Sequence, residues 1–146
     1  MELMSPAGSF ESLMAAIQAG ADSVYFGVEQ LNMRTKSTAN FTIDDLKKIG
    51  EICSMYNVRS YLTLNTIIYD HDIHLMKKII DATKINGISA IIASDLAVMN
   101  YTKKVDMPLH ISTQANVTNI DTIEFFAHYA DVMVLSRELS LMQVKS

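Results

Sequence analysis

The chain has almost no cysteine, little net charge and no long hydrophobic run. Cys53 is the only cysteine among 146 residues. A single thiol excludes an internal disulfide, and it excludes a structural zinc or an iron–sulfur cluster held by several thiolates of this chain. This cysteine content fits a reducing compartment, so we expect a cytoplasmic protein.

Charge and hydropathy argue against a nucleic-acid-binding protein and against a membrane protein. The formal net charge is −4, and lysines come at most in pairs, so the chain offers no long-range attraction for nucleic-acid phosphates. No apolar run approaches the roughly 20 residues of a membrane-spanning helix, and the N-terminus does not resemble a signal peptide. We expect a soluble protein without a membrane partner.

Familiar catalytic motifs are also missing. The sequence contains no Gly-x-Gly-x-x-Gly, no phosphate-binding loop and no nucleophile elbow. His71 and His74 flank Asp72 at a spacing that a metal can use, but the segment is more typical of the start of a solvated helix. We therefore predict no metal site, and we expect core or cap roles for His110 and His128.

Short apolar runs alternate with segments of helical spacing. Each run is hydrophobic on both faces, as expected for a strand in a buried parallel sheet. The predicted strands are Glu2–Met4, Ser23–Phe26, Ser60–Leu64, Ala90–Ala93, Leu109–Ser112 and Val132–Leu135.

A weak repeat links these elements. Ala19–Val24, Asn86–Ile91 and Tyr129–Val134 each run from a helix end through a tight turn into a strand, a pattern typical of (β/α) barrels. A closed barrel of this type has eight strands and about 250 residues. We predict an α/β fold that is (β/α) barrel-like, with six βα units of a TIM-type barrel, incomplete at the C-terminus. A complete doubly wound sheet is the alternative.

The length suits one (β/α) domain over residues 1–146. Because the sequence stops where a further helix begins, we expect this domain to be the N-terminal part of a longer protein. A six-stranded open barrel leaves two sheet edges and part of its inner face uncovered. We therefore expect a homo-oligomer or another association through the open side of the barrel.

Polar residues follow every predicted strand, at the edge where parallel α/β sheets bind their ligands. The most unusual segment is His110–Asn119, which begins as a buried strand and ends in amides that are poor strand formers. We expect these amides to bind a ligand, because they would otherwise be awkward to satisfy. The predicted substrate-binding residues are Gly8, Ser9, Asn32, Arg34, Asn65, Thr113, Gln114 and Asn116.

Several of these positions also have a simpler structural explanation. Gly8 and Ser9 lead from a strand into a helix, so they can hold an anion on backbone N–H groups or merely form a turn and a helix cap. Asn65 can orient a substrate or close the adjoining turn. Asp95 can act as a general base or metal ligand, although a cap for the helix near Leu96 is favoured.

The candidate catalytic residues are Glu138, Arg137 and Asp95. Glu138 or Asp95 can activate a water molecule, while Arg137 or Asn65 steadies the developing oxyanion. The alternative for Arg137 and Glu138 is an ion pair that joins neighbouring loops. No Ser-His-Asp or Cys-His set can be assembled, which counts against ordinary nucleophilic proteolysis.

Six phrases, spread in order over almost the whole chain, carry a resemblance to a known family. They are Glu2–Glu11, Ala19–Gly27, Asn40–Thr42, Leu62–Thr66, His110–Asn119 and Leu135–Ser140. Together they resemble the amino-terminal region of the U32 family of collagenase-like peptidases.

This resemblance implies two different functions. Members are described as bacterial or archaeal peptidases, some as collagenases, without a settled mechanism. Other relatives take part in hydroxylating transfer RNA, ribosomal RNA or a quinone precursor, and they carry an iron–sulfur cluster on four cysteines downstream of the matched region. This chain ends before those cysteines, and Cys53 falls in a predicted helix, so we expect no cofactor in this chain.

The first hypothesis is therefore a peptidase with its substrate cleft at the C-terminal ends of the strands. The second is a non-hydrolytic binding or assembly segment, for peptide, RNA or a partner protein, within an iron–sulfur-dependent hydroxylation protein. We expect the isolated chain to be inactive as an enzyme.

Overall fold

The computed structural model describes residues 1–29, 31 and 41–145. These residues form one sheet of six parallel strands in the order β1-β2-β3-β4-β5-β6. The strands are β1 (Met4–Pro6), β2 (Ser23–Phe26), β3 (Arg59–Leu64), β4 (Ala90–Ala93), β5 (Leu109–Ile111) and β6 (Val132–Met133).

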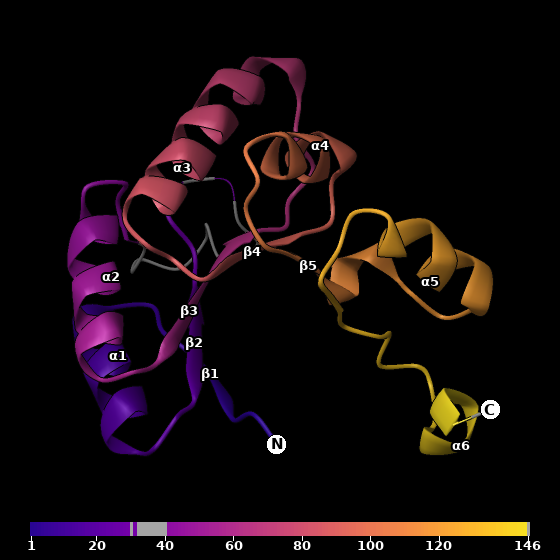
Figure 1. Cartoon of the computed structure of the whole chain (residues 1–146), viewed down its shortest axis with the longest axis horizontal. Coiled ribbons are helices and arrows are strands. Elements are labelled where there is room, and N and C mark those ends of the chain that lie inside the picture. The colour runs from indigo at the N-terminus through magenta and orange to yellow at the C-terminus, as the bar shows by residue number, and fades with distance from the viewer. Residues whose placement is uncertain (30, 32–40, 146) are drawn as a thin grey trace.

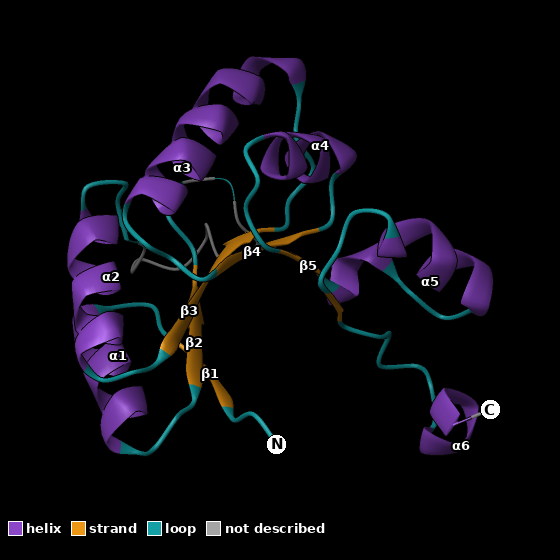
Figure 2. Cartoon of the chain, viewed as in Figure 1, coloured by secondary structure: helices purple, strands orange, loops and turns teal. Residues whose placement is uncertain are grey.

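Helices connect the strands. The α-helices are α1 (Phe10–Gln18), α2 (Asp45–Met55), α3 (Ile73–Ile85), α4 (Leu96–Lys104), α5 (Ile120–Ala127) and α6 (Leu141–Lys145), and short 3-10 helices occur at Asp70–Asp72 and Thr113–Ala115. The sheet curves, and helices α1 to α5 lie along its convex side (Figures 1 and 2). In the part of the chain that the structure describes, no helix has the length and apolar character needed to cross a membrane.

This arrangement decides between the two predicted architectures. A doubly wound sheet reverses its strand order and carries helices on both faces. Here the strands follow one another in sequence order, and the connecting helices lie on one side only (Figure 2). The fold is half of a (β/α) barrel, and the barrel-like prediction is confirmed.

The first strand lies two residues later than predicted. The sequence indicates Glu2–Met4, but the ladder runs over Met4–Pro6. The backbone N–H of Leu3 donates instead to the side-chain carboxylate of Asp22, at 2.7 Å. Pro6 lacks an N–H group, which an edge strand tolerates because one side of it has no partner.

The last two strands are shorter than predicted. β5 ends at Ile111, because the Ser112 side chain accepts a hydrogen bond from the N–H of Gln114 and so caps the 3-10 helix that follows. β6 ends at Met133 rather than Leu135. The polar end of the predicted fifth strand is therefore a capped turn.

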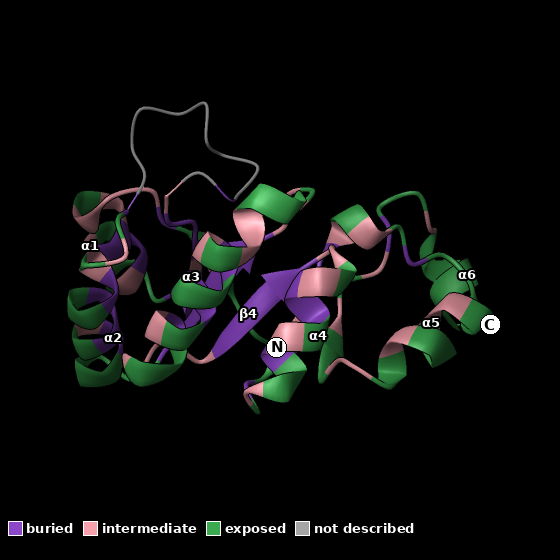
Figure 3. Cartoon of the chain, turned by 90° about the horizontal axis from the view of Figure 1, so that it is seen from above, coloured by how far each residue is buried: buried purple, intermediate pink, exposed green. Residues whose placement is uncertain are grey.

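The main core fills the space between the sheet and the helices. Alternate strand residues such as Val24, Leu62 and Ile91 point to this side and are completely buried, as are Leu13 and Ile79 on the helices. Figure 3 shows this pattern for β4, which is buried, whereas the outer faces of the helices are exposed. Burying apolar area on the scale of about 25 cal/mol per Å² makes this layer the main source of stability.

Helices α1 to α4 share one type of ending. Each is followed by a residue with positive φ, a conformation in which glycine is unstrained and asparagine and aspartate are tolerated. The next N–H group then reaches back to a carbonyl five residues earlier, as from Ala21 to Ala16 and from Ile88 to Thr83. The positive-φ residues are Gly20, Asn57, Gly87 and Asp106.

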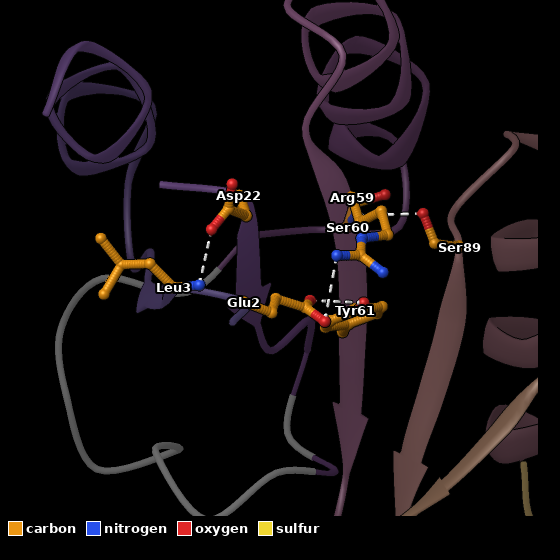
Figure 4. Close-up of polar contacts among 7 residues, drawn as sticks. All are labelled: Glu2, Leu3, Asp22, Arg59, Ser60, Tyr61 and Ser89. Carbon is orange, nitrogen blue, oxygen red and sulfur yellow. Dashed lines mark hydrogen bonds and ion pairs between the residues drawn. The ribbon is translucent and has the colours of Figure 1, made fainter. Parts of the chain in front are cut away.

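The repeated turns in the sequence correspond to one repeated contact. The backbone N–H of Asp131 donates to the carbonyl of Leu109 at 2.8 Å, and its carboxylate accepts the N–H of Leu109 at 2.9 Å. The pairs Asp22 with Leu3 and Ser89 with Ser60 have the same two-way arrangement. Figure 4 shows the side-chain hydrogen bond of each of these two pairs. We call these three contacts the strand latches, because each ties the start of one strand to the residue before the next.

Candidate functional site

Among the described residues, helices α1 to α5 lie on the convex side of the sheet, so none of them covers its concave face (Figure 2). Tyr61, Ala90 and Ile92 form a small cluster on this face, and Tyr25 packs against them. The strand register places Tyr25 beside Tyr61, and it places Ile92 beside His110.

A cavity of about 250 Å³ opens on this face, and we call it the mouth cavity. Every strand contributes to it, either from within the strand or from the residues just after its C-terminal end. Its lining consists of Met4, Tyr25, Thr63, Asn65, Ile92, Ser112, Thr113 and Val134. The mouth cavity therefore occupies the end of the sheet at which parallel α/β proteins bind their ligands.

Two buried hydroxyl groups give the mouth cavity its polarity. The Thr63 hydroxyl donates to the carbonyl of Phe26 at 3.0 Å, so its lone pairs can accept a further hydrogen bond. The Ser112 oxygen accepts the N–H of Gln114 at 3.3 Å, which leaves its own O–H to donate. One acceptor and one donor are thus offered to a ligand.

The structure separates the predicted polar residues of the 110–119 segment. Thr113 lines the mouth cavity. Gln114 and Asn116 are exposed, one in the 3-10 helix and the other at its end with φ 52°. Their amides are not difficult to satisfy, contrary to the expectation from the sequence, because the strand ends before them and both side chains can be solvated. Their role in binding stays a prediction.

Of the other predicted binding residues, Asn65 lines the mouth cavity. Ser9 caps helix α1, and the N–H groups of Gly8 and Ser9 both donate to the Ser12 hydroxyl, at 2.9 Å. This is the turn and cap of the simpler explanation, and anion binding there stays a prediction. Asn32 and Arg34 lie outside the described residues.

Asp95 has the structural role that the sequence favours. One carboxylate oxygen accepts the N–H of Ala97 at 2.8 Å, which caps α4, and the other accepts the N–H of Ile68 at 3.2 Å. The side chain thereby joins α4 to the loop after β3. The cap that the sequence favours is therefore present, and a role for Asp95 as a general base stays a prediction.

Arg137 and Glu138 lie on the exposed loop after β6, a few residues beyond Val134 of the mouth cavity. The buried Ser136 hydroxyl donates to the Glu138 carboxylate. This hydrogen bond holds the pKa of Glu138 below its usual range. Among the described residues, no ion pair joins Arg137 to Glu138, and a loop-joining ion pair stays a prediction.

The opposite end of the concave face carries a polar cluster that the sequence did not reveal. The Glu2 carboxylate lies 3.1 Å from the Arg59 guanidinium and accepts the Tyr61 hydroxyl at 2.8 Å (Figure 4). The His110 ring packs against Tyr61, with centroids 4.7 Å apart. We call Glu2, Arg59, Tyr61 and His110 the basal cluster.

The basal cluster shifts the acid–base behaviour of its members. The Ser23 hydroxyl, helped by Tyr61 and Arg59, holds the pKa of Glu2 below its usual range. Burial and the bond to Glu2 raise the pKa of Tyr61 to about 12.

The sequence holds one indication of the basal cluster. Arg59, Tyr61 and Thr63 alternate along a segment that otherwise looks apolar on both faces. Clusters at this end of a barrel are typically structural.

Histidines elsewhere do not converge on a metal site. His71 lies 3.5 Å from the Asp72 carboxylate. Within residues 1–29, 31 and 41–145, no group of three or more His, Cys, Asp or Glu side chains is arranged so that it could hold a metal ion.

Comparison with known proteins gives the family. The model of peptidase family U32 matches residues 8–146. The chain belongs to peptidase family U32. The resemblance seen in the sequence is thereby confirmed.

Relatives in this family carry two kinds of name. The chain is 57% identical over 145 residues to a collagenase of Porphyromonas gingivalis, a match that covers 99% of the chain and 35% of the relative. It is 33% identical over 144 residues to a tRNA hydroxylation protein P of Helicobacter pylori, covering 97% of the chain and 34% of the relative. The chain thus spans about a third of the length of these relatives.

The fold agrees with the family. The solved structure of a U32 peptidase superimposes with a TM-score of 0.75 at 12% identity, covering 92% of this chain and 58% of the other. At this identity, the likeness concerns the fold alone.

An iron–sulfur cluster, which the resemblance described in the sequence implies for the hydroxylation proteins, does not fit the thiol of this chain. Cys53 is buried in α2, and burial raises its pKa to about 11. Cluster ligands are thiolates, and such clusters take several of them. Cys53 is therefore a core residue.

Proposed function

We propose that the mouth cavity and the Arg137–Glu138 loop form part of the polypeptide-binding cleft of a U32 peptidase. The observation that carries this proposal is the 57% identity to a collagenase over 99% of the chain. The place of the mouth cavity at the C-terminal ends of the strands supports it, because barrel enzymes bind substrates there.

The candidate catalytic residues differ in what they can do. Glu138 is an exposed carboxylate with a lowered pKa, so it is ionised near neutral pH and can hold a water molecule or a substrate N–H group. The lowered pKa makes it a weak general base, since the best bases have a pKa near the working pH. Arg137 is exposed on the same loop and can pair with a carbonyl oxygen that gains charge.

The proposal is tested with peptides derived from gelatin. We expect the chain to bind them, with chemical-shift changes at Asn65 and Thr113 in nuclear magnetic resonance spectra. Arg137→Ala and Glu138→Gln should each weaken binding about three- to tenfold, as loss of one hydrogen bond or charge contact does. Cleavage is followed in parallel by mass spectrometry, with the Porphyromonas gingivalis collagenase as the reference.

The matched control is Glu124→Gln, which makes the same change at an exposed position on α5. It should bind like the unaltered chain. Shift changes confined to surfaces away from the mouth cavity would contradict the proposal. Cleavage that Glu138→Gln and Glu124→Gln retain equally would point to a contaminating protease.

A second candidate function is binding within an RNA hydroxylation protein. The observation that favours it is the match to the tRNA hydroxylation protein of Helicobacter pylori over 97% of the chain. The net charge of −4 argues against it, because phosphate contacts supply most of the affinity for RNA.

Transfer RNA binding separates the two functions. On the peptidase proposal, the chain should show no saturable binding of transfer RNA at 50 mM salt in a filter assay. Saturable binding that weakens steeply between 50 and 200 mM salt, without any binding of gelatin peptides, would favour the hydroxylation function instead.

A further inference from the structure

The mouth cavity is lined without a single charged side chain among the described residues. We propose that it is a subsite for one uncharged side chain of the bound polypeptide, with an apolar stem and a terminal amide, of which glutamine is the best match. The inference rests on the proposed function, because it names the kind of residue that the cleft accepts.

The apolar part of the lining suits the stem of such a side chain. Met4, Ile92 and Val134 come from three different strands or strand ends, and the Tyr25 ring adds a further apolar surface. Ile92 is 8% exposed, whereas Met4 and Val134 are 39% and 38% exposed. Methylene groups placed against these side chains would cover apolar area that now faces water, which favours binding.

The polar part of the lining suits a terminal amide. Thr63 offers a lone pair, because its hydrogen is already donated to the carbonyl of Phe26. Ser112 offers an O–H, because its oxygen already accepts the N–H of Gln114. An amide presents both an N–H donor and a carbonyl acceptor, so it can satisfy both groups, whereas a carboxylate or an ammonium offers only one kind.

Because the polar groups of the lining are buried and uncharged, the cavity should select uncharged side chains over charged ones. Thr63 and Ser112 are 8% and 4% exposed, and a charge placed beside them loses hydration without gaining a counterion. Among the described residues, Asp95, Arg137 and Glu138 do not line the cavity, and both Asp95 carboxylate oxygens already accept N–H groups. An unpaired charge in such a place is strongly disfavoured.

The test uses four blocked pentapeptides, acetyl-Gly-Gly-Xaa-Gly-Gly-amide, in which Xaa is glutamine, glutamate, norleucine or lysine. Each is titrated into the chain, and the shifts of the Thr63 and Ser112 amides give the dissociation constant. The glutamine peptide should bind at least tenfold more tightly than the glutamate peptide, which has nearly the same shape. The lysine peptide should bind more weakly than the norleucine peptide.

A pair of variants tests whether the peptide preference arises in the mouth cavity. Ser112→Asp and Ser112→Asn both keep an oxygen that can accept the Gln114 N–H, so both keep the cap. Only Ser112→Asp adds a negative charge, and it should raise the affinity for the lysine peptide at least tenfold relative to Ser112→Asn. If Ser112→Asp does not fold, Thr63→Val serves instead, and it should weaken glutamine binding several-fold without changing norleucine binding.

The outcomes separate this inference from the proposed function. Equal binding of the glutamine and glutamate peptides, or a Ser112→Asp variant with unchanged preference, would overturn the subsite and leave a peptide-binding cleft. Failure of every peptide, and of the gelatin peptides, to bind would overturn the proposed function and the subsite with it.

Discussion

His110 shows how much one residue depends on its surroundings. The sequence predicted a core or cap role, but the structure places the ring on the concave face against Tyr61. Burial, together with the Arg59 charge, lowers the pKa of His110, although the carboxylates of Asp131 and Glu2 oppose this shift. The folded chain therefore favours the neutral imidazole more than the unfolded chain does.

A pH dependence of stability follows from this shift. Above the ordinary histidine pKa of 6.5 both states are neutral and stability is at its full value. As the pH falls below 6.5, the unfolded chain binds the proton more readily, so the free energy of unfolding decreases until the pH has passed the folded pKa. Urea denaturation at pH 7.5 and 5.5 should show this loss, and His110→Gln should reduce it.

Glu2 acts in a different pH range. Its pKa is held below 4.5, so its contribution to stability is lost only at lower pH.

The control for the His110 experiment is His74→Gln, which removes a histidine at an exposed position on α3. The prediction would be refuted if His110→Gln and His74→Gln lost equal stability between the two pH values.

At the scale of elements, the strand latches explain why the turn phrases repeat. Each latch pairs a residue before a strand with the start of the neighbouring strand, through one backbone and one side-chain hydrogen bond. Asp22, Ser89 and Asp131 have short polar side chains that can reach back to a backbone N–H group. The latches thereby fix the register of parallel strands, which have no hairpin turn to set it.

Removing a latch should destabilise the fold. Asp131→Ala leaves the partly buried N–H of Leu109 without its acceptor, and we expect the free energy of unfolding to fall by about 1–2 kcal/mol. Asp131→Asn keeps an acceptor oxygen, so its free energy of unfolding should fall by less. Both are measured by urea denaturation at pH 8, where His110 is neutral in either state.

Glu51→Ala is the control for this series, because Glu51 is exposed on α2. It should change stability by less than about 0.5 kcal/mol. A loss in Glu51→Ala as large as in Asp131→Ala would mean that the latch contributes nothing of its own.

The six strands were predicted to within two residues at each end. Apolar runs and helical spacing carry that information locally. The end of β5 was not predictable in the same way, because Ser112 forms a cap only when its side chain turns back to Gln114. The predicted binding role of Gln114 and Asn116 relied on a strand that does not extend so far.

At the scale of the whole molecule, the open half-barrel exposes apolar side chains on its concave face. Met4, Val132 and Val134 are 39%, 46% and 38% exposed. Within the described part of the chain, the outer strands β1 and β6 each have one edge without a neighbouring strand. Exposed edges and apolar patches favour association.

We therefore predict that two copies of the chain associate through this open side, in competition with peptide binding in the mouth cavity, which shares Met4 and Val134. Light scattering at micromolar concentration should give more than the mass of one chain, and Val132→Glu should shift the chain towards the monomer. Ile85→Glu places the same charge at an 83% exposed apolar position on α3 and should leave association unchanged. A monodisperse monomer would contradict the prediction.

The sequence by itself determined the alternation of strands and helices, the turns between them, the lack of a thiolate cluster and the resemblance to family U32. These properties depend on neighbours in the chain or on composition. Only the tertiary structure decided which polar residues meet. The reason is that strand register and sheet curvature bring Thr63 and Ser112 into one cavity while Gln114 and Asn116 face solvent, and no local pattern contains that information.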